Sequence, residues 1–138
     1  YPLFYETEAA DILIVHINPI EREDLPWTAT EIMNRINEIS FNSSLLRELR
    51  AIEFVNRLID TGRIAAGTMK RNRIHSISDD ALMAQLGIAT KMTPSRALLW
   101  QLHEAGHAAM DAFLREHRDE IGVCSSVDIR AMIDAPPI

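Results

Sequence analysis

The apolar run ILIVHI at residues 12–17 constrains the fold more than any other part of the sequence. It is bounded by Asp11 on one side and by Asn18-Pro19 on the other. Continuous rather than alternating apolarity is typical of a strand covered on both faces, as in a parallel α/β sheet. Proline cannot continue the ladder of hydrogen bonds. We therefore predict one buried strand at about residues 11–17, with His16 as a hydrogen-bonded core histidine rather than a ligand.

Two amphipathic helices are expected after this strand. Thr28 and Glu31 have the spacing of a capping box, and an apolar stripe follows at Ile32, Ile36 and Ile39. The segment FNSS at residues 41–44 interrupts the pattern, and Asn42 or Ser43 can cap a second helix. The stripe of that second helix consists of Leu45, Leu49, Ile52, Val55 and Ile59. Gly62 follows at the position where glycine ends helices.

The second half of the chain reads as a loop, a short strand and more helices. Residues 73–77 (RIHSI) alternate in polarity, which indicates a second strand with His75 on its exposed, polar side. Asp79-Asp80 opens a short helix that stops at Gly87, and Thr93-Pro94 opens a long helix to about residue 120, stopped by Gly122. The prediction is a predominantly helical α/β fragment, with two strands packed by four or five helices in a single domain or subdomain over residues 1–138.

Composition narrows the function classes. The net charge of -6 argues against nucleic acid as a partner, since the basic cluster at residues 70–73 is short. Cys124 is the only cysteine, so a thiolate metal cluster and an intrachain disulfide are excluded. No apolar run approaches the roughly 20 residues of a membrane-spanning helix. Phosphate-binding loops, dinucleotide fingerprints and the GxSxG elbow are absent from the sequence.

One motif points to catalysis. His103, Glu104 and His107 form HExxH, in which two histidines one helical turn apart bind zinc and the glutamate serves as general base. The helical periodicity, however, puts Leu98, Leu102, Gly106, Ala109 and Phe113 on one face and the histidines on its flank.

The HExxH motif also lacks an evident third ligand, which a catalytic zinc site needs. Glu116 falls on the apolar side of the helix, and Asp128 requires the chain to fold back. We therefore assign no catalytic, cofactor-binding or metal-binding residue and expect no cofactor. A small zinc metalloprotease is kept as an alternative function.

A resemblance to a known family covers nearly the whole chain. Residues 11–22 (DILIVHINPIER), 28–35 and 37–52 (NEISFNSSLLRELRAI) resemble the C-terminal part of bacterial patatin-like phospholipases, with residues 41–49 as the most specific piece. The likeness continues through residues 73–75, the long final helix, Gly122-Val123 and residues 125–128 (SSVD).

The resemblance implies a lipid acyl hydrolase whose aspartate activates a serine in a GxSxG elbow, with a glycine-rich oxyanion loop. All of these motifs lie upstream of the matching part, so none of them maps to a residue here. The expected partners are the upstream catalytic part of the same parent chain and, through it, a lipid or acyl ester. We expect a cytoplasmic or peripheral membrane location. A helical oligomerisation or regulatory module is a further alternative. The oligomeric state is left open by the sequence, although an unpaired strand edge is compatible with a homodimer.

Overall fold

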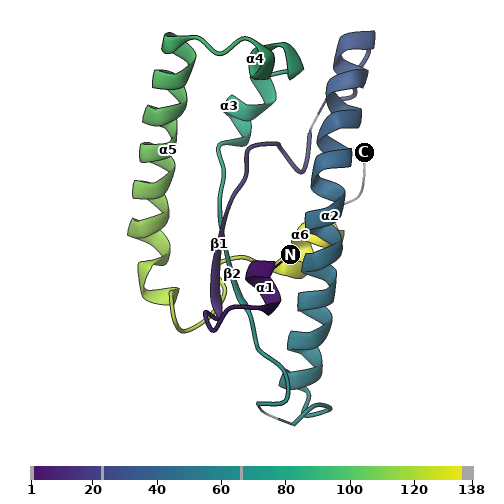
Figure 1. Cartoon of the computed structure of the whole chain (residues 1–138), viewed down its shortest axis with the longest axis vertical. Coiled ribbons are helices and arrows are strands. Elements are labelled where there is room, and N and C mark those ends of the chain that lie inside the picture. Colours follow the sequence, from purple (N-terminus) through teal and green to yellow (C-terminus); the bar gives the residue numbers. More distant parts are fainter. Residues whose placement is uncertain (1, 23, 66, 135–138) are drawn as a thin grey trace.

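The computed structural model describes residues 2–22, 24–65 and 67–134. Its elements are α1 (Pro2–Tyr5), β1 (Asp11–Val15), α2 (Ala29–Asp60), β2 (Arg73–Ile77), α3 (Asp80–Gln85), α4 (Ile88–Met92), α5 (Arg96–His117), the 3-10 turn η1 (Arg118–Glu120) and α6 (Ile129–Asp134). The long helices α2 and α5 stand on opposite sides of the two strands (Figure 1). The chain is predominantly helical with a two-stranded parallel sheet, which confirms the predicted α/β fold class.

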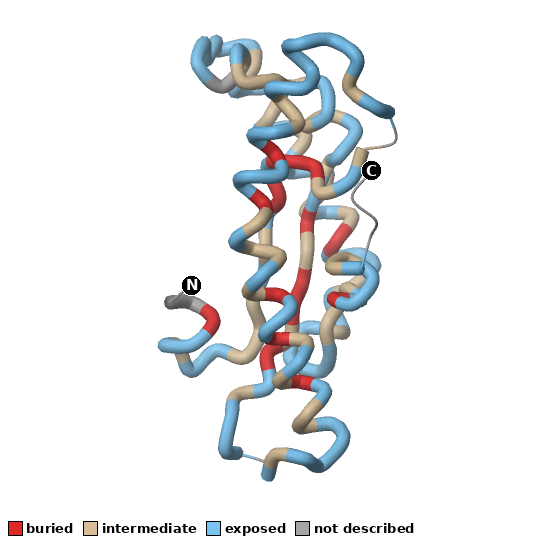
Figure 2. The backbone as a smooth tube through the Cα atoms, turned by 90° about the vertical axis from the view of Figure 1, so that its right-hand side faces the viewer, coloured by how far each residue is buried: buried red, intermediate tan, exposed pale blue. Residues whose placement is uncertain are grey.

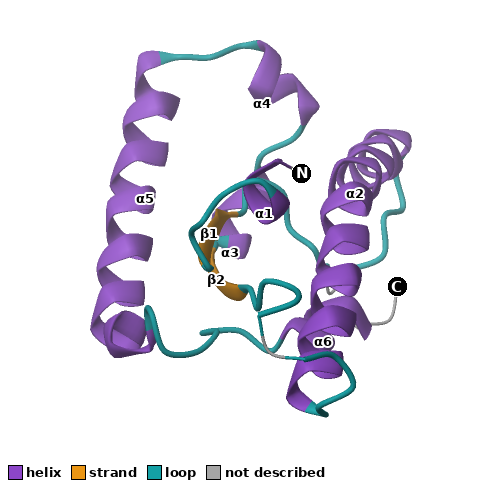
Figure 3. Cartoon of the chain, turned by 60° about the horizontal axis from the view of Figure 1, so that its bottom comes forward, coloured by secondary structure: helices purple, strands orange, loops and turns teal. Residues whose placement is uncertain are grey.

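The two strands are parallel and pair in register from Asp11 opposite Arg73 to Val15 opposite Ile77. Parallel neighbours need a long crossover connection, and α2 provides it. Successive side chains point to opposite faces of the sheet. One face, which carries Ile12, Ile14 and Ile74, packs against α2. The other face turns toward α5, so the sheet is a thin layer between two helices (Figure 3).

The core lies between α2 and the sheet. Its buried members are Phe4, Leu49, Ile52, Ile74 and Ile129, and partly buried side chains from β1, α2 and α6 surround them. Buried positions gather in the middle of the molecule, and the upper end is mostly exposed (Figure 2). The predicted stripe of the second helix is therefore confirmed at Leu49 and Ile52, which are 0% and 2% exposed.

The two predicted helices are one helix, α2, of 32 residues. The segment at 41–44 does not break it, because the side chains of Asn42 and Ser43 find partners without leaving the helix. The Asn42 amide donates to the carbonyl oxygen of Pro19 at 3.0 Å, and the Ser43 hydroxyl donates to the carbonyl oxygen of Ser40 at 2.9 Å. The Asn42 bond reaches a distant loop, and the short-range Ser43 bond would compete with the helix only if it replaced a backbone bond.

The continuous helix buries a different stripe from the one predicted for its first half. The face that packs at Leu49 continues through Asn42 to Glu38, a buried carboxylate paired with Arg22 and Arg35. At 3.6 residues per turn, the stripe of Ile32, Ile36 and Ile39 lies about 120° away from that face. These three side chains are exposed. The prediction that they are buried is wrong because the buried positions in this half are polar.

Strand β1 is less buried than its sequence predicts. It ends at Val15 rather than at residue 17, and Leu13 and Val15 are 43% and 63% exposed. Helix α5 covers the neighbouring strand instead, through an edge-to-face contact between Phe113 and the His75 ring at 5.9 Å. One face of β1 is thus packed, and the other is open.

Other boundaries divide into confirmed and corrected ones. The Thr28–Glu31 capping box forms, and Gly62 and Gly122 take positive φ just past α2 and η1.

The long helix starts at Arg96 under a Ser95 cap and not at Thr93-Pro94. The Thr93 hydroxyl instead donates to the Ala89 carbonyl at the end of α4, a helix that the sequence analysis did not predict. His75 is 2% exposed, so its predicted exposure is wrong.

Within the described residues, every helix falls short of the length and apolarity that crossing a bilayer would require.

Two substitutions on α2 test which stripe supports the fold. We expect Leu49→Ala to lower the free energy of unfolding by about 2–5 kcal/mol, because it leaves a cavity in the core. Ile39→Ala, on the open stripe, is expected to change it by about 0.5 kcal/mol or less. Urea unfolding followed by circular dichroism measures both. Equal losses would contradict the packing of α2.

Candidate functional site

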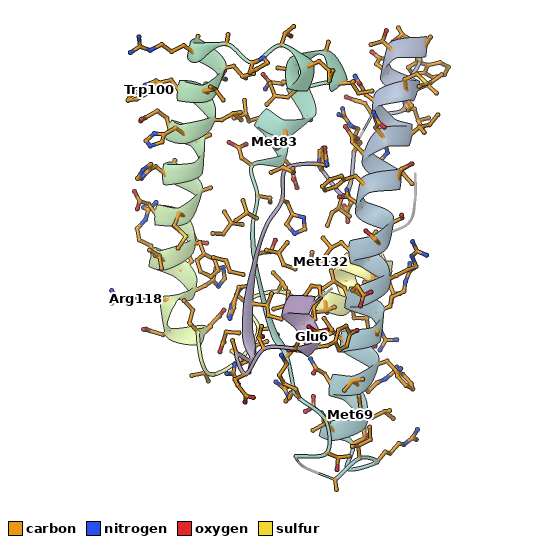
Figure 4. All side chains as sticks on the ribbon, viewed as in Figure 1. Glu6, Met69, Met83, Trp100, Arg118 and Met132 are labelled. Carbon is orange, nitrogen blue, oxygen red and sulfur yellow. The ribbon has the colours of Figure 1, made fainter. Side chains whose placement is uncertain are left out.

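The HExxH residues lie on the outer surface of α5. The ring of His103 stacks on Trp100, with the centroids 5.4 Å apart, and the His107 ring centroid is 4.7 Å from that of His103. Trp100 is on the side of α5 that faces away from the strands (Figure 4). The Glu104 carboxylate lies 3.3 Å from Nδ1 of His103 and is exposed. The arrangement is a small aromatic cluster on a solvated helix face.

A third ligand does not join the two histidines. In the described part of the chain, no group of three or more histidine, cysteine, aspartate or glutamate side chains is placed to hold a metal ion. Asp128 accepts hydrogen bonds from the backbone N–H groups of Arg130 and Ala131 at the start of α6. The geometry therefore does not assemble the zinc site that HExxH would need.

A second constellation, which the sequence analysis missed, joins Asp11, His75 and Ser126. The Ser126 hydroxyl lies 3.1 Å from Nδ1 of His75, and Nε2 of that ring lies 3.1 Å from Oδ1 of Asp11. The order serine–histidine–aspartate is that of a hydrolase triad. The three residues are too far apart in sequence for spacing to reveal the contact.

The surroundings of this array indicate a structural role. His75 is almost completely buried under Phe113, and Asp11 also accepts from the Arg73 guanidinium at 2.8 and 2.6 Å and from the Gly122 N–H at 2.8 Å. The array lies where the parallel strands begin, whereas α/β sheets bind ligands where their strands end. It fastens the turn after α5 to the sheet, together with the Ser126 N–H bond to the Ile74 carbonyl oxygen at 3.1 Å.

The partners of Asp11 fix its charge. The hydrogen bonds from Arg73 lower the pKa of the Asp11 carboxyl far below its ordinary value, against the opposing effect of burial, and Gly122 and His75 lower it further. A carboxyl whose pKa is depressed on folding stabilises the fold fully above its ordinary pKa. That stabilisation is lost as the pH falls from about 3.8 toward the depressed pKa.

At the opposite, carboxyl edge of the sheet lies His16, directly after β1. Its side chain is buried, and Nε2 has no hydrogen-bond partner among the described residues. The prediction of a hydrogen-bonded core histidine is thus wrong for this nitrogen. Burial lowers the pKa of His16, and the nearby Asp80 carboxylate partly opposes that shift. A buried polar atom without a partner costs free energy, about 1–3 kcal/mol, and calls for an explanation.

His16 and Ser78 separate two hollows at this edge. The first is an open apolar groove of about 370 Å³ between the sheet end, α3, α4 and α5, and its apolar walls include Val15, Ile77, Met83, Leu86, Leu98 and Leu102. Met83 lies beside the upper, carboxyl ends of the strands (Figure 4). The second hollow, of about 240 Å³, is more polar and is lined by Ile20, Glu21, Ser76, Asp80 and Met132.

The apolar stripe of α5 was predicted correctly, and it forms one wall of the groove. What periodicity could not reveal is that most of the stripe lacks a packing partner. Only Phe113 at its lower end is buried.

Asp80 lines the second hollow. Burial, together with the charges of Asp79 and Glu21, raises the pKa of its carboxyl, and His16 acts against them.

Comparison with known proteins yields no match among family models, curated proteins or solved structures. Function therefore has to be argued from the residues and their geometry.

Asp11→Asn tests the array at the amino edge. We expect it to reduce the free energy of unfolding at pH 7 by about 1.5–3 kcal/mol, the range for hydrogen bonds to charged groups. The loss should shrink as the pH falls below about 3.8, because the Asp11 carboxyl of the unfolded chain then takes up a proton while that of the folded chain stays ionised. Asp60→Asn is the matched control, since Asp60 pairs with Arg71 on the exposed surface and should cost about 1 kcal/mol or less. A loss independent of pH would contradict this assignment.

The histidines of α5 are expected to contribute little. We predict that the double substitution His103→Ala, His107→Ala changes the free energy of unfolding by about 0.5 kcal/mol or less, as for ordinary surface positions. Equimolar zinc should leave the melting temperature of the chain unchanged. If the unsubstituted 138-residue chain retains zinc through dialysis and the double variant does not, the metal-site hypothesis is restored.

Proposed function

We propose that this chain is the C-terminal section of a patatin-like lipid acyl hydrolase whose serine–aspartate dyad lies in an upstream part of the parent protein. In this proposal the section completes and covers the sheet and contributes no catalytic residue. The resemblance of residues 11–52 motivates the proposal. It also leads us to propose a cytoplasmic or peripheral membrane location for the parent.

The observation that carries the proposal is the open edge of β1. The ladder bonds from Arg73 N–H to Ala10 and from His16 N–H to Ile77 show that even-numbered residues of β1 face β2. The N–H and C=O groups of Asp11, Leu13 and Val15 therefore point to the other side, where the described residues provide no further strand. Two strands alone form a marginal sheet, and an uncovered apolar edge invites pairing. This favours a sheet that continues beyond β1 in the parent.

The carboxyl edge offers further support. Active sites of α/β sheets lie where parallel strands end. In this chain that edge carries the apolar groove, a suitable neighbour for the acyl chain of a lipid. A dyad supplied by adjacent strands of the parent would reach the same edge.

One alternative has an observation of its own. The uncovered stripe of Ile32, Ile36 and Ile39 on α2 favours an interaction module, because exposed apolar patches mark contact surfaces. The zinc protease has no such support, since the histidines of α5 lack a third ligand within the described residues.

The parent protein tests the proposal. Its gene should encode a DGG or DGA turn shortly before Tyr1 and a GxSxG elbow further upstream. We expect the parent to hydrolyse p-nitrophenyl butyrate and to react with a fluorophosphonate at the elbow serine. This 138-residue chain should do neither, because it lacks the dyad.

A pair of substitutions in the parent separates the edge from the rest of the surface. Leu13→Lys should sharply reduce the yield of active parent, because it puts a charge where the sheet continues. Leu99→Lys, at an exposed position of α5, should not. A parent without esterase activity, or hydrolysis by this chain alone, would overturn the proposal.

A further inference from the structure

The polar hollow at the carboxyl edge lies on the face of the sheet that packs against α2. Ile14 of β1 is paired with Ser76 of β2, and Ile14 packs onto the core on that face. His16 is two positions further on, and its N–H group donates to the carbonyl oxygen of Ile77 at 2.9 Å, as in the ladder. Its side chain therefore points to the same face as that of Ile14. Both His16 and Ser76 line the hollow.

The lining of this hollow offers acceptors for a positively charged group. Its volume of about 240 Å³ is that of about eight water molecules at about 30 Å³ each. The carboxylates of Glu21 and Asp80 and the hydroxyls of Ser76 and Ser78 line it, and its described lining includes no lysine or arginine. The charge of Glu21 contributes to the raised pKa of Asp80, as expected where carboxylates lie close to one another.

His16 supplies a second, independent indication of a ligand. The residue is 8% exposed, and Nε2 finds no hydrogen-bond partner among the described residues. Burial lowers the pKa of the ring, which favours the neutral form, and a neutral imidazole has one nitrogen that accepts a hydrogen bond. The last side-chain torsion of histidine has broad wells. A small rotation of the ring thus brings Nε2 to a donor in the hollow.

The spacing of the acceptors favours a guanidinium. In the part of the chain that the structure describes, no three such side chains are placed around one metal ion, so His16, Glu21 and Asp80 do not converge on a single point. An ammonium is also a compact charge, whereas a guanidinium presents five N–H donors in a planar fork. Ile20 and Met132 add apolar wall to the hollow, which suits the methylene groups of an alkyl stem.

We propose that the polar hollow binds a guanidinium group on a short alkyl stem, the chemistry of an arginine side chain. Its N–H groups meet the exposed carboxylates of Glu21 and Asp80 and the Nε2 atom of His16, and its methylene groups lie against Ile20 and Met132. All of these residues belong to this chain, so the inference is independent of the function proposed for the parent.

Titration of the 138-residue chain, followed by the NMR shifts of its backbone amides, tests the site with three matched ligands. Butylguanidinium carries the proposed group, butylurea is its uncharged analogue of nearly the same shape, and butylammonium is a compact cation. We expect butylguanidinium to shift the signals of Glu21, Ser76, Ser78 and Asp80. The other two ligands should bind at least about tenfold more weakly, a difference of about 1.4 kcal/mol.

A blocked arginine, with its amino group acetylated and its carboxyl group methylamidated, distinguishes two sources of the same group. An affinity equal to that of butylguanidinium would indicate a free small molecule, because the guanidinium and its stem then suffice. An affinity at least about tenfold higher would indicate an arginine within a polypeptide, because the flanking peptide groups then contribute. Both results support the site.

Asp80→Asn and Asp111→Asn are a matched pair, since each removes one negative charge from an exposed helical position. Asp80→Asn should weaken butylguanidinium binding about fivefold, the upper range for an exposed ion pair. Asp111→Asn, on α5, should leave the affinity within about twofold. Circular dichroism verifies that each variant is folded.

His16→Phe separates binding from stability. It keeps an aromatic ring and removes the buried nitrogen that has no partner among the described residues. Binding should weaken about threefold or more, as for the loss of one hydrogen bond, while the melting temperature stays the same or rises. A purely structural histidine would instead lower the melting temperature when replaced.

Three results would overturn the inference. Equal affinity for butylurea and butylguanidinium would show that the charge is not recognised. Butylammonium binding as tightly as butylguanidinium would show that the planar fork is not recognised. An absence of binding at millimolar concentrations, or an equal loss in Asp80→Asn and Asp111→Asn, would show that the hollow is not the site.

Discussion

The carboxylate of Asp11 connects three parts of the chain that sequence keeps far apart. It accepts hydrogen bonds from Arg73 and His75 of the second strand and from the Gly122 N–H after the last long helix. A parallel pair of five-residue strands is weak on its own. Asp11 stands opposite Arg73 at the first position of the register, so the same ion pair aligns the strands. Through Gly122 it also ties the turn that follows α5 to the sheet.

Local signals in the sequence were reliable where a short segment decides its own conformation. The capping box at Thr28, the second strand and the helix stop at Gly62 are all confirmed. Two predictions of exposure or burial were wrong where a distant partner decides the outcome. His75 reads as an exposed residue of an alternating strand, but it is buried because Phe113 covers it and Asp11 and Ser126 satisfy its nitrogens. Periodicity identified Ile32, Ile36 and Ile39 of α2 as a stripe, yet the buried side chains in that half of the helix are those of Glu38 and Asn42.

The residues that look most catalytic do not lie at the best place for chemistry. HExxH is on the outer face of α5, and the serine–histidine–aspartate array is at the edge where the strands start. The carboxyl edge, where α/β sheets usually bind ligands, instead carries two hollows and the buried His16, whose Nε2 has no hydrogen-bond partner in the part of the chain that the structure describes. Motif spacing could not indicate this, because His16 follows the first strand and Ser78 follows the second, and only their parallel pairing places them at one edge.

Helix α2 is far longer than the sheet it covers. Its 32 residues extend about 48 Å at 1.5 Å per residue, whereas five residues of strand extend about 17 Å. One half is fixed to the core by Leu49 and Ile52. The other half is held as well, by the buried side chains of Glu38 and Asn42 and by the hydrogen bond from the Ile88 N–H to Oδ1 of Asn34 at 3.1 Å. Its open side carries Ile32, Ile36 and Ile39 on a backbone that is already fixed. A partner that packs on these three side chains therefore meets a preorganised surface, and binding costs α2 little conformational entropy.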